Sequence, residues 1–480
     1  MGFKEDFKRE MRNTTNDVAK EVEKQWVLHF EGHTIEIMNK MLEETLKVDG
    51  EILAQNVRKS IWSHIFPYSK LSGTFIGKSG KKHKVHVKIG GFIKFHITVK
   101  VDGQKLLTDS MSLEMLPWKN KERLVPFLEQ QFHEHEKLAN KELPDDVYLY
   151  DEGQMKFAHG FSDQLVNESV LPTYTKKLIK LFLQQVDNPS DATRKATYEK
   201  IQDEKVISYF HEFVALFLEV EEDEALIQKE AIWLLEHAAH REVVKFALLV
   251  LGMTNCENVK ERLKSIALHE EFTGVALFAL TNGCRNINDD VWGIAQHTSD
   301  WGKLAAMNFL EPEREEIRLW FLTHGVEGVV GGNHAPLLCA EKGQLDIELH
   351  EDTITGTTFE GVSKLIFALV YEAYNSQMDD YEFAGQVLMR YTKHAKTHSK
   401  TLTHFYTLIE IANYMNVSEE EWENRFVTNW KPHEKLGVET AIKEISQNPK
   451  WLEESQILLV NQPDHREAIA IVDFLTIELE

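Results

Sequence analysis

The stretch GTFIGKSGKKHKVHVKIGGFIKFHITVK, residues 73–100, holds the residue types most suggestive of chemistry in this chain. Gly77-Lys78-Ser79 matches the end of a phosphate-binding loop, GxxxxGK[ST], in which backbone N–H groups between a strand and a helix cradle phosphate. Gly73 precedes Gly77 by one residue too few for that motif, and the alternating residues after Ser79 predict a strand. We therefore expect no nucleotide site here.

The same region concentrates positive charge. Between Phe66 and Leu106 there are nine lysines and one acid, Asp102, a local formal charge of +8, which leaves −31 for the rest of a chain whose total is −23. The acidic total argues against general nucleic-acid binding, which needs many phosphate-neutralising lysines and arginines. The local lysines could instead bind an anion through this segment alone. Such an anion could be phosphate, nucleic acid or an acidic protein surface.

Histidines offer metal-ligand chemistry in two places. His83, His86 and His96 lie among lysines that would repel a cation. In MRYTKHAKTHSK, His394 and His398 have the spacing that puts two imidazoles on one helix face, and His404 follows. No HExxH motif occurs, so we expect neither a metal site nor a cofactor. The other paired histidines are expected on helix surfaces or in packing and capping: His133, His135, His237 and His240.

Nucleophilic catalysis finds no support. No GxSxG turn occurs, and no cysteine has a local histidine partner. Cys256, Cys284 and Cys339 are odd in number and far apart, which predicts neither a disulfide framework nor a CxxC metal knuckle and fits a reducing cytoplasm. The charged N-terminus lacks the apolar core of a secretory signal, and no run of about 18 apolar residues predicts a membrane helix. We expect a cytoplasmic protein.

The elements that hold these residues are predicted from the hydrophobic period. Residues 3–62 are predicted as helical, with Phe30, Ile35 and Ile37 among their apolar positions. From residue 85 the period becomes two, with a valine, an isoleucine or, at position 95, a phenylalanine alternating with a polar residue over 85–89 and 93–101. This predicts a three- or four-stranded antiparallel meander with hairpin turns at 90–91 and 102–103. Residues 1–145 are thus predicted as an α+β domain.

Pairing across the glycines at 90–91 is predicted to set Val87 opposite Phe95. The same register sets His86 opposite His96 and Lys88 opposite Lys94 on the exposed face, where like charges are destabilising. An anionic partner would relieve them, and the predicted binding residues are Lys84, His86, Lys88, Lys94, His96 and Lys100. Two alternatives stay open for these lysines: they are solvated and discourage edge aggregation, or they dock against the chain's own acidic helices.

Residues 146–480 are predicted as helical repeats, clearest over 240–351. VKFALLVLG, GVALFALTN and GKLAAMNFL align without gaps and place Ala247, Ala276 and Ala305 29 residues apart, and Ala335 follows after 30 more. A two-helix unit of about 30 residues cannot bury an apolar face alone, so such units stack into an α-solenoid.

This pattern resembles HEAT-like repeats, best in DWGKLAAMNFLEPEREEIRLWFLTHG. There Asp300, Lys303, Ala306 and Leu310 sit where the HEAT pattern favours an acid, a base, an alanine and a leucine. The resemblance implies a solenoid with an extended protein-binding surface. Much of the chain is also similar to uncharacterised bacterial helical-repeat proteins, some of them labelled limonene hydroxylases, which implies an oxygenase. The sequence carries no cysteine in a haem-type glycine-rich loop, no dinucleotide fingerprint and no two-histidine-one-carboxylate cluster for such chemistry.

The sequence therefore favours a non-enzymatic binding or scaffold protein whose solenoid engages a protein partner, with no membrane association. Aromatic residues and arginine dominate binding hot spots, so the predicted solenoid contacts are Trp292, Arg318 and Trp320. Three alternatives stay open. The lysine-rich sheet face binds nucleic acid or another anion; the chain is an enzyme, as the limonene hydroxylase label states; or the basic sheet meets the acidic solenoid of a second copy.

Overall fold

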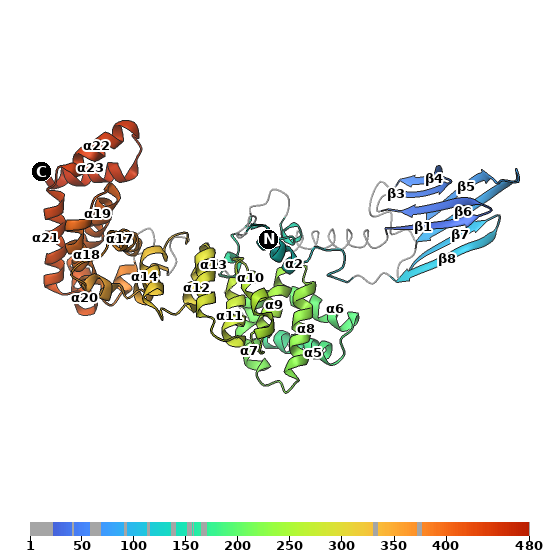
Figure 1. Ribbon diagram of the computed structural model, residues 1–480, viewed down its shortest axis with the longest axis horizontal. Coiled ribbons are helices and arrows are strands. Elements are labelled where there is room, and N and C mark those ends of the chain that lie inside the picture. The colour runs from blue at the N-terminus through green and yellow to red at the C-terminus, as the bar shows by residue number, and fades with distance from the viewer. Residues whose placement is uncertain are drawn as a thin grey trace. The chain divides into compact units, whose positions relative to one another are not determined.

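The computed structural model describes residues 23–40, 43–57, 69–90, 94–112, 116–135, 141–150, 156, 158–164, 170–329, 335–371 and 377–479. Two four-stranded antiparallel sheets come first in the chain, and helices follow (Figure 1). The chain divides into two compact units. The first comprises 1–127, 142–156 and 169–246, and the second comprises 128–141, 157–168 and 247–480. The predicted division at residue 145 stays a prediction.

The first sheet lies where helix was predicted. It is a meander in the order β1-β2-β3-β4, with bounds β1 Lys24–Phe30, β2 His33–Asn39, β3 Glu43–Val48 and β4 Glu51–Val57. The helical prediction for 3–62 is therefore wrong over 23–40 and 43–57, and its remaining residues lie outside the described ranges. Ile35 and Ile37 alternate with Thr34 and Glu36, so the true period is two. Glu31-Gly32 and Asp49-Gly50 adopt positive φ angles, as two-residue hairpin turns require.

The second sheet confirms the predicted meander as four strands in the order β5-β6-β7-β8. Its bounds are β5 Ser69–Ile76, β6 Lys82–Gly90, β7 Lys94–Val101 and β8 Gln104–Ser112. The turn at Asp102-Gly103 is confirmed, with φ of 49° and 85°. The predicted register between β6 and β7 is wrong by four residues: Val87 pairs with Val99, not with Phe95. Strand β6 runs to Gly90, which pairs with His96, so the chain does not turn at 90–91 as predicted.

The two meanders are copies of one plan. Ile37 pairs with Leu46 between β2 and β3, as Val87 pairs with Val99 between β6 and β7. Each third strand carries a register shift directly after that residue, between Leu46 and Lys47 and between Val99 and Lys100. Every strand of the first sheet thus has an equivalent in the second, which makes a residue-by-residue comparison of the two sheets meaningful.

One hydrophobic core lies between the two sheets. Each sheet contributes alternate residues from its inner face, among them Trp26, Ile35, Ile37, Leu46 and Val48 from the first, and Leu71, Val85, Val87, Ile97 and Val99 from the second. The alternation of buried and exposed residues along β6 shows the physical basis, because successive side chains of a strand point to opposite faces. The outer face of each sheet is left free to vary in composition.

The first unit continues with helices. Among them are α2 Leu124–His135, which crosses into the second unit's range, α3 Asp146–Leu149, α5 Pro172–Asp187, α6 Asp191–Gln202, α7 Val206–Phe217, α8 Glu224–His237 and the start of α9 Arg241–Leu251. Buried aromatic residues join them, with the ring of Phe246 edge-on to Phe182 and Phe213. Arg241 holds the segment before α3 in place by ion pairs with Asp145 and Asp146.

The second unit is helical throughout its described length. Its helices include α4 Phe161–Gln164, α10 Lys260–Ala267, α11 Thr273–Gly283, α12 Asn288–His297, α13 Asp300–Phe309, α14 Glu315–His324, α15 Ala335–Lys342, α16 Leu345–His350, α17 Gly356–Val370, α18 Ala384–His398, α19 Leu402–Met415, α20 Glu419–Thr428, α21 Pro432–Ser446, α22 Lys450–Asn461 and α23 Arg466–Leu479. No helix in the described ranges has the length and apolar character needed to cross a bilayer.

The predicted repeat helices exist. Ala276, Ala305 and Ala335 lie on α11, α13 and α15, and α11 contacts α13 as α13 contacts α15. The second helix of each predicted two-helix unit is present as well, since α10, α12 and α14 follow α9, α11 and α13 along the chain. A Cβ atom added to Gly274 on α11 would lie 3.9 Å from the methyl group of Ala305, which shows how small residues let these helices approach.

Candidate binding surface

The outer side of the second sheet forms a surface that we call the lysine face. Its charged and titratable members, brought together from all four strands by the register, are Lys70, Lys82, Lys84, His86, Lys88, His96, Lys100 and Lys105. They alternate with the buried core residues, so their side chains point outward. The structure therefore places five of the six predicted binding residues on one face, and their role in binding stays a prediction. The sixth, Lys94, begins β7 opposite Ser112, and its side chain lies outside the described residues.

The predicted like-charge pairs are replaced by different ones. His86 lies opposite Lys100 rather than His96, and Lys88 lies opposite Thr98 rather than Lys94. On the other side of β6, Lys88 faces Lys70, and on the far side of β7, Lys100 faces Lys105. Cross-strand neighbours are about 5 Å apart at their Cα atoms, so these ammonium groups repel one another.

Within the described parts of β5–β8, no acid has the outward parity of the lysine face. Asp102 lies in the turn, and Asp109 has the inward parity of its partner Ile97. The Asp109 carboxylate accepts hydrogen bonds from Lys24 Nζ and Trp26 Nε1 of β1, both at 2.9 Å, which explains why its pKa is lowered. It therefore serves the joint between the two sheets and leaves the lysine face cationic.

The first meander shows that the fold does not require these lysines. At the positions equivalent to Lys70, Lys84, His86, Lys88 and Lys105 the first sheet has Gln25, Thr34, Glu36, Met38 and Ile52. Its outer face sets Glu36 directly opposite Lys47, an attractive pair, where the second sheet sets His86 opposite Lys100. The same backbone plan thus accepts a balanced face, so the lysines add nothing that the sheet itself needs.

His83 takes no part in the lysine face. It is buried on the core side of β6, with Nδ1 2.8 Å from Asp102 Oδ2 and Nε2 3.2 Å from Glu31 Oε2, and its ring stacks on Phe75. His83 therefore cannot join His86 and His96, which point outward, in a metal site. The first copy repeats the device, because His33 Nδ1 lies 2.6 Å from Asp49 Oδ2. These pairs secure the hairpin turns.

Gly77-Lys78-Ser79 forms part of the turn between β5 and β6. The backbone N–H of Gly77 donates to Lys81 O, and that of Gly80 donates to Gly77 O. The segment therefore connects two strands and does not open a helix, which confirms that it is no phosphate-binding loop.

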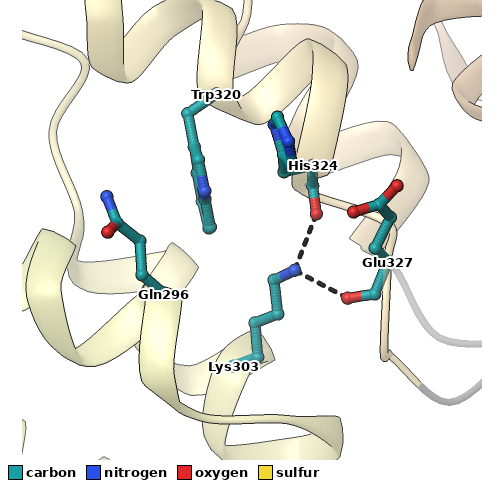
Figure 2. A pocket seen from close by; sticks show the side chains of 5 residues that line it. All are labelled: Gln296, Lys303, Trp320, His324 and Glu327. Carbon is teal, nitrogen blue, oxygen red and sulfur yellow. Dashed lines mark hydrogen bonds between the residues drawn. The ribbon is translucent and has the colours of Figure 1, made fainter. Parts of the chain in front are cut away.

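The second unit holds a pocket of about 390 Å³ lined by Gln296, Lys303, Trp320, His324 and Glu327 (Figure 2). The Lys303 ammonium donates to the backbone carbonyls of His324 and Glu327, both at 2.6 Å, and lies 5.1 Å from the Trp320 ring centre. Burial lowers the pKa of Lys303. The Lys303 ammonium is thus already bound by backbone carbonyls at the C-terminal end of α14 and just beyond it. Lysine side chains commonly donate to the free carbonyls of a helix C-terminus in this way.

The predicted solenoid contacts lie on α12 and α14. Arg318 donates to Glu348 Oε2 at 2.7 Å and to Gly343 O at 3.1 Å, so its guanidinium already has partners inside the second unit. Trp320 lines the pocket described above, and Trp292 lies 5.2 Å from the Arg314 guanidinium. A contact of these three residues with a partner protein stays a prediction.

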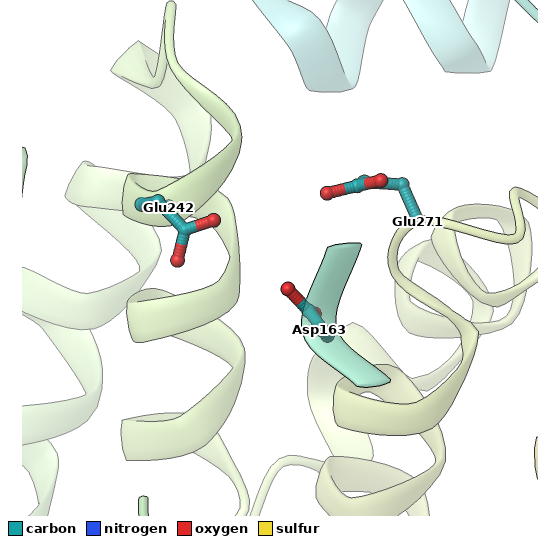
Figure 3. Close-up of side chains that lie close together, drawn as sticks. All are labelled: Asp163, Glu242 and Glu271. Atoms are coloured by element: carbon teal, nitrogen blue, oxygen red, sulfur yellow. The ribbon is translucent and has the colours of Figure 1, made fainter. Parts of the chain in front are cut away.

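Buried titratable groups gather around the loop before α11. Asp163 on α4 and Glu271 have carboxylate oxygens within 4.8 Å of each other (Figure 3). Glu271 accepts from the N–H of Gly160 at 3.0 Å, and burial lowers the pKa of the neighbouring His269 to about 4. Glu242, also drawn in Figure 3, belongs to the first unit and accepts there from the N–H of Val206 at 2.7 Å. Glu271 thus binds the backbone of the loop before α4, and Glu242 binds the backbone N–H at the N-terminus of α7.

The remaining candidate histidines have separate partners. His394 Nε2 lies 3.2 Å from Leu349 O, and His404 Nε2 lies 3.0 Å from Glu360 Oε2. His240 is partly buried, with Nδ1 3.0 Å from the Tyr198 hydroxyl, and the loss of solvation there lowers its pKa to about 3. The expectation of packing roles for His240 and for His237, which stacks on Trp233, is confirmed. The side chains of His133 and His135 lie outside the described residues.

Sequence reasoning missed one pair of chemical groups. Cys256 and Cys284 are far apart along the chain, but their sulfur atoms lie 3.5 Å apart. The available signal is their separation of 28 residues, which nearly equals the 29-residue repeat period. Neighbouring repeats bring equivalent positions side by side, so a near-periodic spacing of cysteines predicts proximity.

Comparison with known proteins adds no identity to this geometry. No protein-family model matches the chain, and neither a curated protein nor a solved structure matches it significantly.

Proposed function

We propose that this chain is a non-catalytic binding protein whose lysine face holds an acidic segment of a partner protein. One observation carries the proposal: the second sheet has Lys70, Lys84, Lys88 and Lys105 on positions where its copy, the first sheet, has neutral residues, and only Lys100 has a lysine, Lys47, as its equivalent. Cross-strand repulsion between lysines costs stability, and carboxylates placed over the face would relieve that cost.

An acidic polypeptide fits this face better than nucleic acid does. Single-stranded nucleic acid is held by aromatic side chains on which bases stack, and bidentate base recognition uses arginine. The described outer residues of β5–β8 include neither an aromatic residue other than histidine nor an arginine. A long polyanion would also meet the field of the remaining chain, whose formal charge is −31, whereas a short acidic segment meets only the local charge of +8.

The helices of the second unit support a second surface in the same proposal. Consecutive first helices contact each other from α11 to α13 to α15, as they do in a HEAT-like solenoid. Stacked repeats present an extended face suited to protein chains. Trp292 and Trp320 are its candidate contacts. We place the protein in the cytoplasm in this proposal, because its three cysteines are free thiols.

The test measures binding to the full-length protein. Two fluorescent probes are used: a deca-glutamate peptide and an oligothymidine of the same length. The binding of each probe is measured by fluorescence anisotropy at low and moderate salt. We expect the peptide to bind more tightly than the oligothymidine. The triple substitution Lys70→Glu, Lys84→Glu and Lys100→Glu should weaken the affinity for the peptide at least about tenfold. Three exposed ion pairs at roughly 0.5 kcal/mol each amount to about that factor.

The matched control makes the same change of charge elsewhere in the first unit. Lys176, Lys177 and Lys180 are exposed on α5, and their substitution by glutamate should leave peptide binding close to wild type. Equal losses in both triple variants would show a general charge effect and refute a defined face. Tighter binding of the oligothymidine would move the function to nucleic acid. A purified protein carrying haem or flavin absorbance would support the oxygenase alternative instead.

A further inference from the structure

The second unit holds two thiols in van der Waals contact at the joint between consecutive helical hairpins. Cys256 is fully buried in the turn before α10, and Cys284 follows α11 and is partly exposed. Their sulfur atoms are 3.5 Å apart, against about 2.05 Å in a disulfide, so a small movement brings them to bonding distance. The third cysteine, Cys339, is buried elsewhere, with Met307 as its sulfur neighbour.

The surrounding contacts hold the two thiols together. The backbone N–H of Cys256 donates to Gly283 O at 3.0 Å, which ties the turn to the end of α11. Arg285 N–H donates to Glu257 Oε2 at 3.0 Å, and Lys260 Nζ donates to Arg285 O at 3.0 Å. These bonds lie on both sides of the pair. The sulfurs are therefore positioned by the fold and do not meet by chance fluctuation.

The glycine beside Cys284 is required for this arrangement. A Cβ atom added to Gly283 would lie 2.3 Å from the Cys256 sulfur and 2.6 Å from Thr254 O. Any other residue at 283 would therefore displace the Cys256 thiol. The absence of a side chain at this position is what allows the two sulfurs to approach.

We propose that Cys256 and Cys284 are a redox modification site that closes to an intramolecular disulfide when the protein meets a small oxidised disulfide such as oxidised glutathione. The more exposed Cys284 reacts first. Its thiolate, having lost its proton to water, attacks one sulfur of oxidised glutathione and releases one glutathione thiolate. Cys256, having likewise lost its proton to water, then attacks the Cys284 sulfur as the thiolate and releases the second glutathione thiolate. The two released thiolates take up the two protons. Two protein thiols and one glutathione disulfide become one protein disulfide and two glutathione thiols.

The reaction is expected to be slow at neutral pH and faster in alkali. Burial raises the pKa of both thiols, that of Cys284 through its partial burial and that of Cys256 more strongly. Because only the thiolate attacks, the rate rises up to tenfold per pH unit while both thiols remain protonated. The charged groups nearest Cys284 are Glu257, Lys260 and Asp290. Lys260 lowers its pKa, and the two acids oppose that effect.

The experiment incubates the folded full-length protein with oxidised glutathione at pH 8, removes the glutathione, blocks the remaining thiols with iodoacetamide in urea and maps peptides by mass spectrometry. We expect the free thiols to fall from three to one, with Cys256 joined to Cys284 in a species lacking two hydrogens and Cys339 alkylated. Cys339→Ser should leave this disulfide unchanged. Cys256→Ser should stop at a stable mixed disulfide of Cys284 with glutathione.

Two outcomes would overturn the proposal. In the first, all three thiols of the folded wild-type protein stay free, although the same treatment in urea oxidises them. In the second, wild type accumulates the glutathione mixed disulfide on Cys284 as persistently as Cys256→Ser does, which would show that Cys256 cannot reach its neighbour. Circular dichroism of each variant confirms that the protein compared is folded.

Discussion

The two meanders share a backbone plan and one core, yet their outer faces differ in charge. In the first, Glu36 lies opposite Lys47; in the second, Lys70 lies opposite Lys88, and Lys100 lies opposite Lys105. Inner residues stay apolar in both because the core excludes water. The comparison separates what folding demands from what it merely tolerates, and it is the reason we propose a binding role for the lysines.

The comparison also exposes a polar exception at one layer of the first copy's core. Asn39 and Glu44 pair between β2 and β3 and are both buried, where the second copy pairs Ile89 with Ile97. Glu44 accepts a hydrogen bond from the Ser69 hydroxyl, the first residue of β5. At this layer the first copy therefore uses a polar group to meet the second sheet, where the second copy has two isoleucines.

The largest expected effect tests whether the two meanders truly share one core. Leu46→Ala in the first sheet should lower the free energy of unfolding by about 2–5 kcal/mol, because it leaves a cavity in a fully buried position. Since that core is common, amide hydrogen exchange should accelerate in β6 and β7 as well as in β2 and β3. Ile52→Ala on the exposed face is the control, and it should change the free energy of unfolding by less than about 0.5 kcal/mol. Acceleration confined to β1–β4 would show two independent cores.

The next effect concerns the polar exception. Glu44→Ala should destabilise the protein by about 1–3 kcal/mol in urea unfolding, because the Ser69 hydroxyl loses its buried acceptor. The double substitution Asn39→Ile and Glu44→Ile copies the second meander and should recover most of that loss. A double variant no more stable than Glu44→Ala would mean that the two copies are not interchangeable at this layer.

The turn aspartates predict a common acid dependence in both copies. The pKa of Asp49 is lowered by its hydrogen bonds from Thr34 N–H and His33, and that of Asp102 by those from Lys84 N–H and His83. A folded-state pKa below the unfolded value, about 3.9, contributes stability above that pH, which is lost as pH falls through the folded pKa. The variant Asp49→Asn with Asp102→Asn should therefore be less stable than wild type at pH 6, and the difference should shrink by pH 2. An unchanged difference in urea midpoint between these pH values would contradict this account.

The smallest effect separates stability from binding. Lys105→Glu replaces a repulsive cross-strand pair with Lys100 by an attractive one and should stabilise the protein by about 0.2–1 kcal/mol. Lys47→Glu makes the reverse change opposite Glu36 in the first copy and should destabilise by a similar amount. Lys105→Glu should also weaken the acidic peptide, whereas Lys47→Glu should not. A Lys105→Glu variant that is both less stable and unaltered in binding would remove the lysine face from the function.

The second meander could be predicted because its evidence is local. Valine and isoleucine alternate strictly with lysine and histidine over 85–89, and Asp102-Gly103 is a strong turn signal. The first meander carries the same Asp-Gly signal at Asp49-Gly50, but its strands mix apolar residues onto the outer face, including Val27, Met38 and Ile52. Those extra apolar residues interrupt the period of two, and the resulting hydrophobic pattern is also compatible with a helix.

The members of the candidate surface could be predicted, but their pairing could not. Alternation alone places Lys84, His86 and Lys88 on one face, because a strand has a period of two. Their neighbours depend on the length of the β6–β7 connection, and a shift of four residues keeps every side chain on its face while replacing every partner. The hydrophobic pattern cannot distinguish registers that differ by an even number of residues.

The sequence by itself determined a sheet with an outward lysine face and the helices that carry the alanine repeat, since both follow from local periodicity and charge. The tertiary structure decided that two meanders close on one core, that Asp109 turns away from the lysines toward Trp26, and that Cys256 meets Cys284. Each of these depends on which distant segments pack together. That choice is made by the summed burial of many side chains and by connection geometry, which no short stretch of sequence contains.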